Sequence, residues 1–261
     1  MRNIVQFAIL IAICSLLQLV STAAADTLSV ISWNLDARDE GEAVAAEIYP
    51  EMAACHLLCL TRSDAKQFNS IEKSLGKNFL ACEMERPSMQ ILYDQRRLQC
   101  LRQGELKIDE VHSWLGLFRD IETKVDFYIL VNEFSKGDGH RAEAEAIRLW
   151  CEQQTLPIIG LGDFGFEVNY ESLRGNRPFD EFMRDYRWRW VRPYPLVDTL
   201  WQDLDQDDQD DQPNTCSDFI YLGGGALNWL ARVKVDPPQG SKKHETGTKG
   251  HRPVRLSVDP R

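Results

Sequence analysis

Four polar residues stand at the ends of predicted β-strands in segments that lie far apart along the chain. Asn34 ends the run 28–34, Asp163 follows the apolar run 156–162, Asp218 begins a strand, and His251 precedes an alternating one. A carboxylate at the end of a buried strand is costly to desolvate unless it faces a cleft, a partner or a metal. Rigid strands can deliver such groups to one rim of an α/β scaffold. The pattern predicts a shared site for acid–base or metal chemistry, the alternative being that Asp163 only caps a loop.

The elements expected to position these residues alternate between strands and helices. Apolar runs bounded by Gly and Pro predict buried strands, and Ser63-Asp64 and Gly76 are typical of a helix start and stop. Strands are expected over 28–35, 56–61, 125–134 and 157–162, and helices over 40–54, 63–75 and 140–154. Two short strands around residues 94–97 are expected to form a hairpin.

The motifs carrying the polar residues follow one another in a specific order. They are Ser32-Trp33-Asn34, Gly162-Asp163-Phe164, Ser217-Asp218-Phe219-Ile220 and His251-Arg252-Pro253-Val254. In order and spacing they resemble the strand motifs of the endonuclease/exonuclease/phosphatase superfamily, from Leu28 to Val258. Each motif alone is weak, and the order makes the resemblance specific.

The resemblance implies a fold and a reaction. The fold would be α/β (α+β), a two-sheet β-sandwich flanked by helices in the four-layer, deoxyribonuclease I-like arrangement. In the family, a metal ion such as Mg²⁺ or Mn²⁺ polarises a phosphate ester. By this resemblance Asp163 would orient or deprotonate the attacking water, and His251, oriented by a carboxylate, would contact the phosphate; Asn34 and Asp218 are the other catalytic candidates. Asn34 and Asp163 would be the metal ligands if a metal is bound.

The chain also departs from the family pattern at four positions. Arg62 stands where the family has its metal-binding Glu, and Glu133 where it has a His. Gly165 and Gly250 replace a further Asn and Asp. A cation cannot ligate a divalent metal, although a guanidinium matches a phosphate bidentately. Arg62 and Glu133 are therefore candidate binding residues, and Glu133 or Glu167 would be the replacement carboxylate if a metal site persists.

Three functions stay open from these matches and departures. The departures favour a family protein whose metal site is eroded and which is inactive or weakly active on phosphate esters, since the metal supplies several kcal/mol of transition-state stabilisation. The first alternative is an active metal-dependent phosphodiesterase or nuclease. The second is a non-catalytic structural or anion-binding envelope protein. The substrate is not predicted, because specificity lies in variable loops.

The first 25 residues have the pattern of a secretory signal peptide. A basic start is followed by an apolar run over 4–20 and by small residues up to Ala25. This pattern predicts export, to a secreted or periplasmic location, and one domain over 26–261 with no transmembrane span after the leader is removed. An uncleaved membrane anchor is the alternative. The oligomeric state is not predicted.

The net charge of the chain argues against some classes of partner. The chain has a formal net charge of −10, which disfavours nucleic acid, whose binding depends on Lys and Arg. A local groove of arginines and aromatic residues over 184–192 is the one exception, with the alternative that its Trp residues point inward and its Arg residues outward.

Six cysteines follow the leader and permit up to three disulfides in an exported chain, or else some are buried core residues.

Two further segments read as loops. Residues 203–211 are rich in Asp, and their Asp-x-Asp-x-Asp start resembles a calcium loop. The Gly and Glu that such a loop requires are absent, so a solvated, self-repelling loop is expected. Residues 236–248, with Pro and Gly, are expected to form a second loop.

Overall fold

The part of the chain that the structure describes excludes several of these segments. The computed structural model describes residues 27–35, 54–83, 88–108, 111–134, 137, 139–201, 211, 215–236 and 250–261. The expected leader lies outside them, as do nearly all of the helix expected over 40–54, the acidic segment 203–211 and the loop 236–248.

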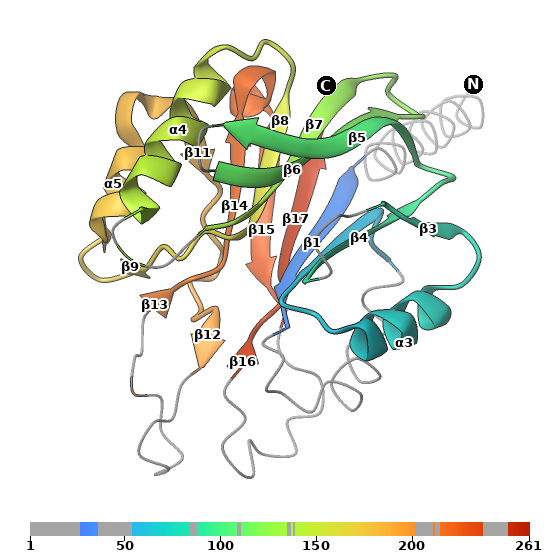
Figure 1. Cartoon of the computed structure of the whole chain (residues 1–261), viewed down its shortest axis with the longest axis horizontal. Coiled ribbons are helices and arrows are strands. Elements are labelled where there is room, and N and C mark those ends of the chain that lie inside the picture. Colours follow the sequence, from blue (N-terminus) through green and yellow to red (C-terminus); the bar gives the residue numbers. More distant parts are fainter. Residues whose placement is uncertain are drawn as a thin grey trace, which may run out of the picture.

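A first six-stranded sheet is built from both ends of the described chain (Figure 1). Its strand order is β15-β17-β1-β2-β4-β3. The strands are β1 (Leu28–Asn34), β2 (Leu57–Thr61), β3 (Phe79–Ala81), β4 (Met89–Asp94), β15 (Leu230–Val235) and β17 (Val254–Asp259). Because β1 and β2 are parallel, they carry their C-terminal residues to the same edge of the sheet.

A second six-stranded sheet has the order β11-β14-β8-β7-β6-β5. Its strands are β5 (Leu98–Ile108), β6 (Val111–Asp120), β7 (Asp126–Glu133), β8 (Ile158–Asp163), β11 (Trp188–Trp190) and β14 (Phe219–Gly223). β7 and β8 are its parallel pair. Two small sheets lie in the lower part of the molecule as drawn in Figure 1. They comprise β9 (Val168–Asn169), β10 (Arg174–Gly175) and β13 (Thr215–Cys216), and β12 (Leu200–Trp201) paired with β16 (Gly250–His251).

Alternation along the central strands explains why the sheets are buried on both faces. In β14, Ile220 and Leu222 join a core cluster shared with strands of the first sheet, while Phe219 and Tyr221 join a cluster on the opposite face. β2 divides its side chains in the same way. Successive strand residues point to opposite faces, so each sheet contributes one face to the shared core and covers the other with helices.

The helices complete the outer layers. α3 (Ala65–Leu75) covers the first sheet, and its N-terminus is capped by Asp64, whose carboxylate accepts from the backbone N–H of Lys66 and Gln67. α4 (His140–Glu152) and α5 (Arg177–Phe182) cover the second sheet over an aromatic-rich cluster (Figure 1). The order is helix, sheet, sheet, helices, which confirms the expected four-layer α/β sandwich.

One local prediction was wrong. The strands on either side of residues 94–97 do not form a hairpin, because β4 pairs with β2 and β3 whereas β5 pairs with β6 in the other sheet. The turn itself exists, with Arg97 N–H donating to the Asp94 carbonyl. Buried Arg97 pairs with Asp120 of β6 at 2.9 Å, beside the point where β5 begins to pair with β6 in the second sheet. Local sequence marked the turn but not the sheet to which each strand belongs.

No helix among the described residues is long and apolar enough to cross a membrane.

Candidate functional site

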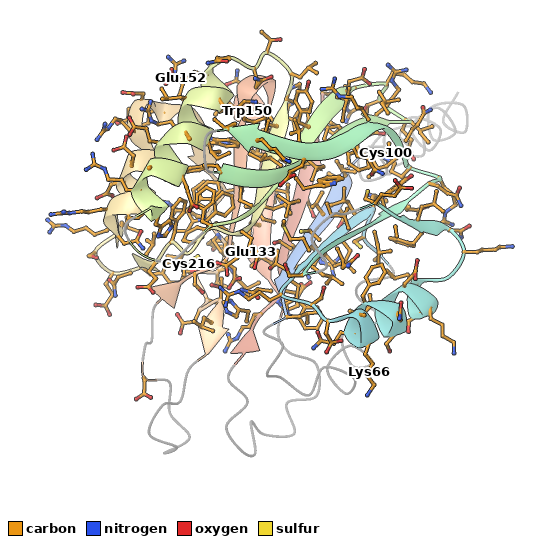
Figure 2. All side chains as sticks on the ribbon, viewed as in Figure 1. Lys66, Cys100, Glu133, Trp150, Glu152 and Cys216 are labelled. Atoms are coloured by element: carbon orange, nitrogen blue, oxygen red, sulfur yellow. The ribbon has the colours of Figure 1, made fainter. Side chains whose placement is uncertain are left out.

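Strand register brings the predicted polar residues to one edge of the sandwich. Asn34 lies opposite Thr61 in the parallel pair β1 and β2, so Arg62 follows directly beside it. Asp163 lies opposite Glu133 in the parallel pair β7 and β8. The edge where β16 approaches the ends of β1 and β14 is visible in Figure 1, and Figure 2 shows Glu133 near the same edge.

His251 and Asp218 form a dyad at this edge. His251 Nδ1 lies 2.7 Å from Asp218 Oδ2, and most of both side chains is buried. Burial opposes protonation of the imidazole, but the charge and hydrogen bond of Asp218, with a smaller contribution from Asp163, outweigh it and raise the pKa of His251. In the neutral tautomer that donates its Nδ1–H to Asp218, Nε2 carries no proton. This nitrogen can then accept a hydrogen bond or a proton from a group in the site.

Asn34 lies between the His251–Asp218 dyad and the carboxylate of Asp163. Its Nδ2 is 3.4 Å from His251 Nε2 and 3.5 Å from Asp163 Oδ2. Its Oδ1 is buried without a hydrogen-bond partner among the described residues. A buried acceptor left unpaired costs free energy, so this carbonyl is suited to receive a donor from a bound molecule.

Three further side chains hold the dyad in place, and none of them was predicted from the sequence as a site residue. The Trp33 indole N–H donates to the His251 carbonyl at 3.0 Å. Thr199 Oγ1 accepts the backbone N–H groups of Ser217 and Asp218, at 2.9 and 3.0 Å, and Ser217 Oγ donates to Asp218 Oδ2. Trp33 and Ser217 lie in the Ser32-Trp33-Asn34 and Ser217-Asp218-Phe219-Ile220 motifs, whereas Thr199, in the segment Val197-Asp198-Thr199, lies in neither.

Asp163 is positioned by an irregular backbone. Gly162 has φ +113°, and a Cβ there would lie 2.4 Å from the carbonyl oxygen of Asn132. The Gly165 N–H donates to Asp163 Oδ1 at 2.9 Å, and the Phe134 N–H donates to the Asp163 carbonyl at 3.0 Å. These contacts leave Asp163 Oδ2 facing the other side chains of the site.

Arg62 contacts the Asp163 carboxylate at Oδ2, the oxygen that faces the site. Its Nη2 lies 2.6 Å from Asp163 Oδ2, with 27% of the Arg62 side chain and 10% of the Asp163 side chain exposed. Arg62 has φ +54°, in the left-handed region that non-glycine residues rarely adopt. The strain is of the kind that accumulates at ligand-binding positions.

Glu133 reaches the edge but does not pair with the arginine. Its Oε2 accepts from Ser88 Oγ at 2.8 Å, and the Ser88 carbonyl in turn accepts the Ser63 N–H at 3.2 Å. Ser88 therefore ties Glu133 to the segment that follows Arg62.

These residues do not fit a divalent metal. Mg²⁺ and Mn²⁺ take oxygen ligands, chiefly carboxylates, whereas here a guanidinium contacts the Asp163 oxygen that faces the site. Across the described residues no three His, Cys, Asp or Glu side chains are grouped so that they would hold a metal ion.

Comparisons with solved structures show which fold this is. An endonuclease/exonuclease/phosphatase family protein from Bacteroides thetaiotaomicron superposes with a TM-score of 0.64 at 15% identity, covering 89% of this chain and 97% of its own. A TDP2 of D. rerio complexed with single-strand DNA product gives 0.64 at 12% identity, covering 89% and 98%. A mannosyl-6-phosphatase of Bacteroides thetaiotaomicron gives 0.61 at 15%, covering 88% and 99%.

The chain therefore has the deoxyribonuclease I-like fold of endonuclease/exonuclease/phosphatase proteins, and the resemblance read from the sequence motifs is confirmed at the level of the fold. No protein-family model matches the sequence, and a search of curated proteins finds no relative.

The cysteines are not paired in the structure. All six that follow the expected leader are free thiols, so the expected disulfides are not found. Five of them are buried, namely Cys55, Cys59, Cys82, Cys151 and Cys216. Burial raises the pKa of Cys55 to about 12 and that of Cys151 to about 11, which is typical of core thiols rather than reactive ones.

Proposed function

We propose that this chain is an exported endonuclease/exonuclease/phosphatase-family protein in which an arginine–aspartate ion pair replaces the metal site, leaving it inactive or weakly active on phosphate esters. The leader over 1–25 would direct it to a secreted or periplasmic location, with residues 26–261 forming one domain. The single observation that carries the proposal is the 2.6 Å contact between Arg62 Nη2 and Asp163 Oδ2.

Electrostatics supports the loss of the metal. A cation already neutralises the carboxylate that a metal would need, and a second cation at the same oxygen would be repelled. The family mechanism draws several kcal/mol of transition-state stabilisation from its metal, so its loss removes most of the rate acceleration.

The remaining polar groups support binding of an anion. Arg62 is partly exposed and keeps further N–H donors, and the Asn34 amide and the His251 ring lie beside its carboxylate partner. A phosphate group matches a guanidinium fork geometrically. The ligand class is thus a phosphate ester or another small anion.

One specific observation favours the alternative of an active enzyme. His251 and Asp218 are joined by a 2.7 Å hydrogen bond, which would orient the imidazole as a general acid or base needs. Residual, metal-independent turnover would then depend on His251, whereas metal-dependent turnover would depend on displacing Arg62 from Asp163.

The test combines a turnover assay with calorimetry on the full chain. Bis-p-nitrophenyl phosphate and plasmid DNA are incubated with Mg²⁺, with Mn²⁺ and with chelator, alongside Asp163→Ala. We expect no chelator-sensitive turnover, and we expect inorganic phosphate to bind wild type and to bind Arg62→Gln at least about fivefold more weakly. Chelator-sensitive turnover that disappears in Asp163→Ala would overturn the proposal. Absence of phosphate binding would leave a purely structural role.

A further inference from the structure

A cavity of about 460 Å³ opens at the edge of the second sheet, between β11 and α5. Its walls are mainly apolar and come from Leu173, Phe179, Met183, Trp188, Trp190 and Leu227. Its volume lies in the range of small-molecule sites, which are commonly apolar with a few polar groups. None of the residues of the candidate phosphate site lines it.

Two arginines give the cavity a charge opposite to that of the protein as a whole. Arg189 and Arg192 line it, and neither forms an ion pair with any described carboxylate. The Arg192 guanidinium instead lies 5.4 Å from the Trp190 ring centroid, and Arg189 donates to the Trp229 carbonyl. In a chain of net charge −10, two arginines that lack a carboxylate partner within the described ranges provide local complementarity to an anion.

The strand that forms the cavity carries unsatisfied donors. The indole N–H of Trp190 and the Nε–H of Arg189 are buried without an acceptor among the described residues. Such donors cost free energy when left unpaired. Both atoms are shielded from the open cavity, so they do not contribute contacts to its ligand.

Residues with left-handed backbone lie at the cavity. Tyr186, with φ +55°, also lines the cavity while 88% of the residue is exposed, and Asp185 before it has φ +60°. Two consecutive non-glycine residues in the left-handed region are rare. Leu173 on the cavity wall also has φ +53° and is 45% exposed. An apolar side chain kept exposed beside an apolar cavity marks a binding surface.

We propose that this cavity binds an amphiphilic anion, a single acyl chain with a carboxylate head, the chain lying on the Trp and Leu walls and the head at Arg192, whose guanidinium lies over the Trp190 ring. The flexible Leu and Met side chains suit an acyl chain, since they adapt to its shape. Nucleic acid, which would also use aromatic and arginine side chains, is disfavoured by the net charge of the protein.

The test measures binding of dodecanoate to the full chain by calorimetry, below its micelle concentration. Dodecyltrimethylammonium and dodecyl maltoside provide a cationic and a neutral head on the same chain. We expect dodecanoate to bind at least about fivefold more tightly than either, because one favourable charge contact at a partly exposed site contributes about that factor. Equal binding of all three would overturn the proposal, and so would displacement of dodecanoate by an oligothymidylate.

Two variants and one control locate the site. Leu173→Asp places a negative charge on the wall and suits the left-handed backbone, which Asp tolerates better than Leu. It should weaken dodecanoate binding about tenfold, and Arg192→Gln about fivefold. Arg187→Gln removes an arginine on the same segment that pairs with Glu152 and does not line the cavity, so it should leave the affinity unchanged. Unaltered affinity in both cavity variants would overturn the proposal.

Discussion

Arg62 Nη2 lies 2.6 Å from Asp163 Oδ2, and the two residues come from different sheets of the sandwich. Arg62 directly follows β2, where the sequence resemblance predicts the metal-binding Glu of the family, and Asp163 ends β8. The guanidinium brings the positive charge that a metal would bring there, but without its open coordination positions. In the proposed function this ion pair takes the place of a metal at the edge of the sandwich.

Replacing the arginine by the family residue should create a metal response. Arg62→Glu puts a second carboxylate beside Asp163, and we expect it to lower the free energy of unfolding by about 1–3 kcal/mol in chelator, discounted for the partial exposure of Arg62. Mn²⁺ should restore stability, because a ligand that binds only the folded state stabilises it. Thermal melting with and without Mn²⁺ measures both effects.

Arg62→Gln is the matched control for this prediction. It removes the same charge at the same left-handed backbone position but adds no carboxylate, so its melting temperature should not respond to Mn²⁺. If wild type and Arg62→Glu melted identically in chelator and in Mn²⁺, the ion pair would not be a substitute for a metal.

The dyad predicts a defined pH dependence. The pKa of His251 is raised in the folded state, so its charged form stabilises the fold fully below the unfolded pKa, about 6.5. That contribution is lost as the pH rises through the higher, folded pKa. Asp218→Asn should lower the pKa of His251, and its loss of stability relative to wild type should be larger at pH 5.5 than at pH 9.

Proton NMR titration of the histidine rings measures this shift directly. His56 is an internal reference, because burial, with a further contribution from Arg97, lowers its pKa. Its Nδ1 accepts the Ser29 N–H at 3.0 Å, as a neutral ring would. A His251 pKa that is unchanged in Asp218→Asn would contradict the electrostatic account of the dyad.

Gly162 should be intolerant of any side chain. At φ +113° an added Cβ would lie 2.4 Å from the Asn132 carbonyl oxygen, which belongs to the neighbouring strand backbone and cannot move aside. We expect Gly162→Ala to cost about 2–4 kcal/mol in the free energy of unfolding measured in urea. Gly104→Ala on β5, where nothing lies within 4 Å of the added Cβ, should change it by less than about 1 kcal/mol. Equal losses of unfolding free energy in Gly162→Ala and Gly104→Ala would show that the backbone at position 162 does not require glycine.

Among the six described cysteines, Cys100 should react first with iodoacetamide in the native protein. It is partly exposed, and its hydrogen bond with Cys82 holds the pKa of its thiol below the usual value. Burial raises the pKa of Cys216 to about 12, so that thiol should be modified only on unfolding. Peptide mapping by mass spectrometry measures the order, and a disulfide-linked peptide pair in protein purified without reductant would contradict it.

Much of the fold was readable from local patterns. Apolar runs bounded by Gly and Pro predicted β1, β2, β7 and β8, and Ser63-Asp64 with Gly76 predicted α3. The order of the Asn34, Asp163, Asp218 and His251 motifs predicted the four-layer sandwich by resemblance. These signals are local, because the alternation of a strand and the capping of a helix are set by neighbouring residues.

What tertiary structure alone decided is how separate segments meet. The turn at 94–97 was visible in the sequence, but only pairing with distant strands shows that it joins two sheets. The substitution at Arg62 was visible too, whereas its contact with Asp163 depends on how two sheets pack. The sequence alone left the pairing of the cysteines open, and in the structure all six thiols are free. Each of these features depends on contacts between residues far apart in the chain, and a local pattern does not specify them.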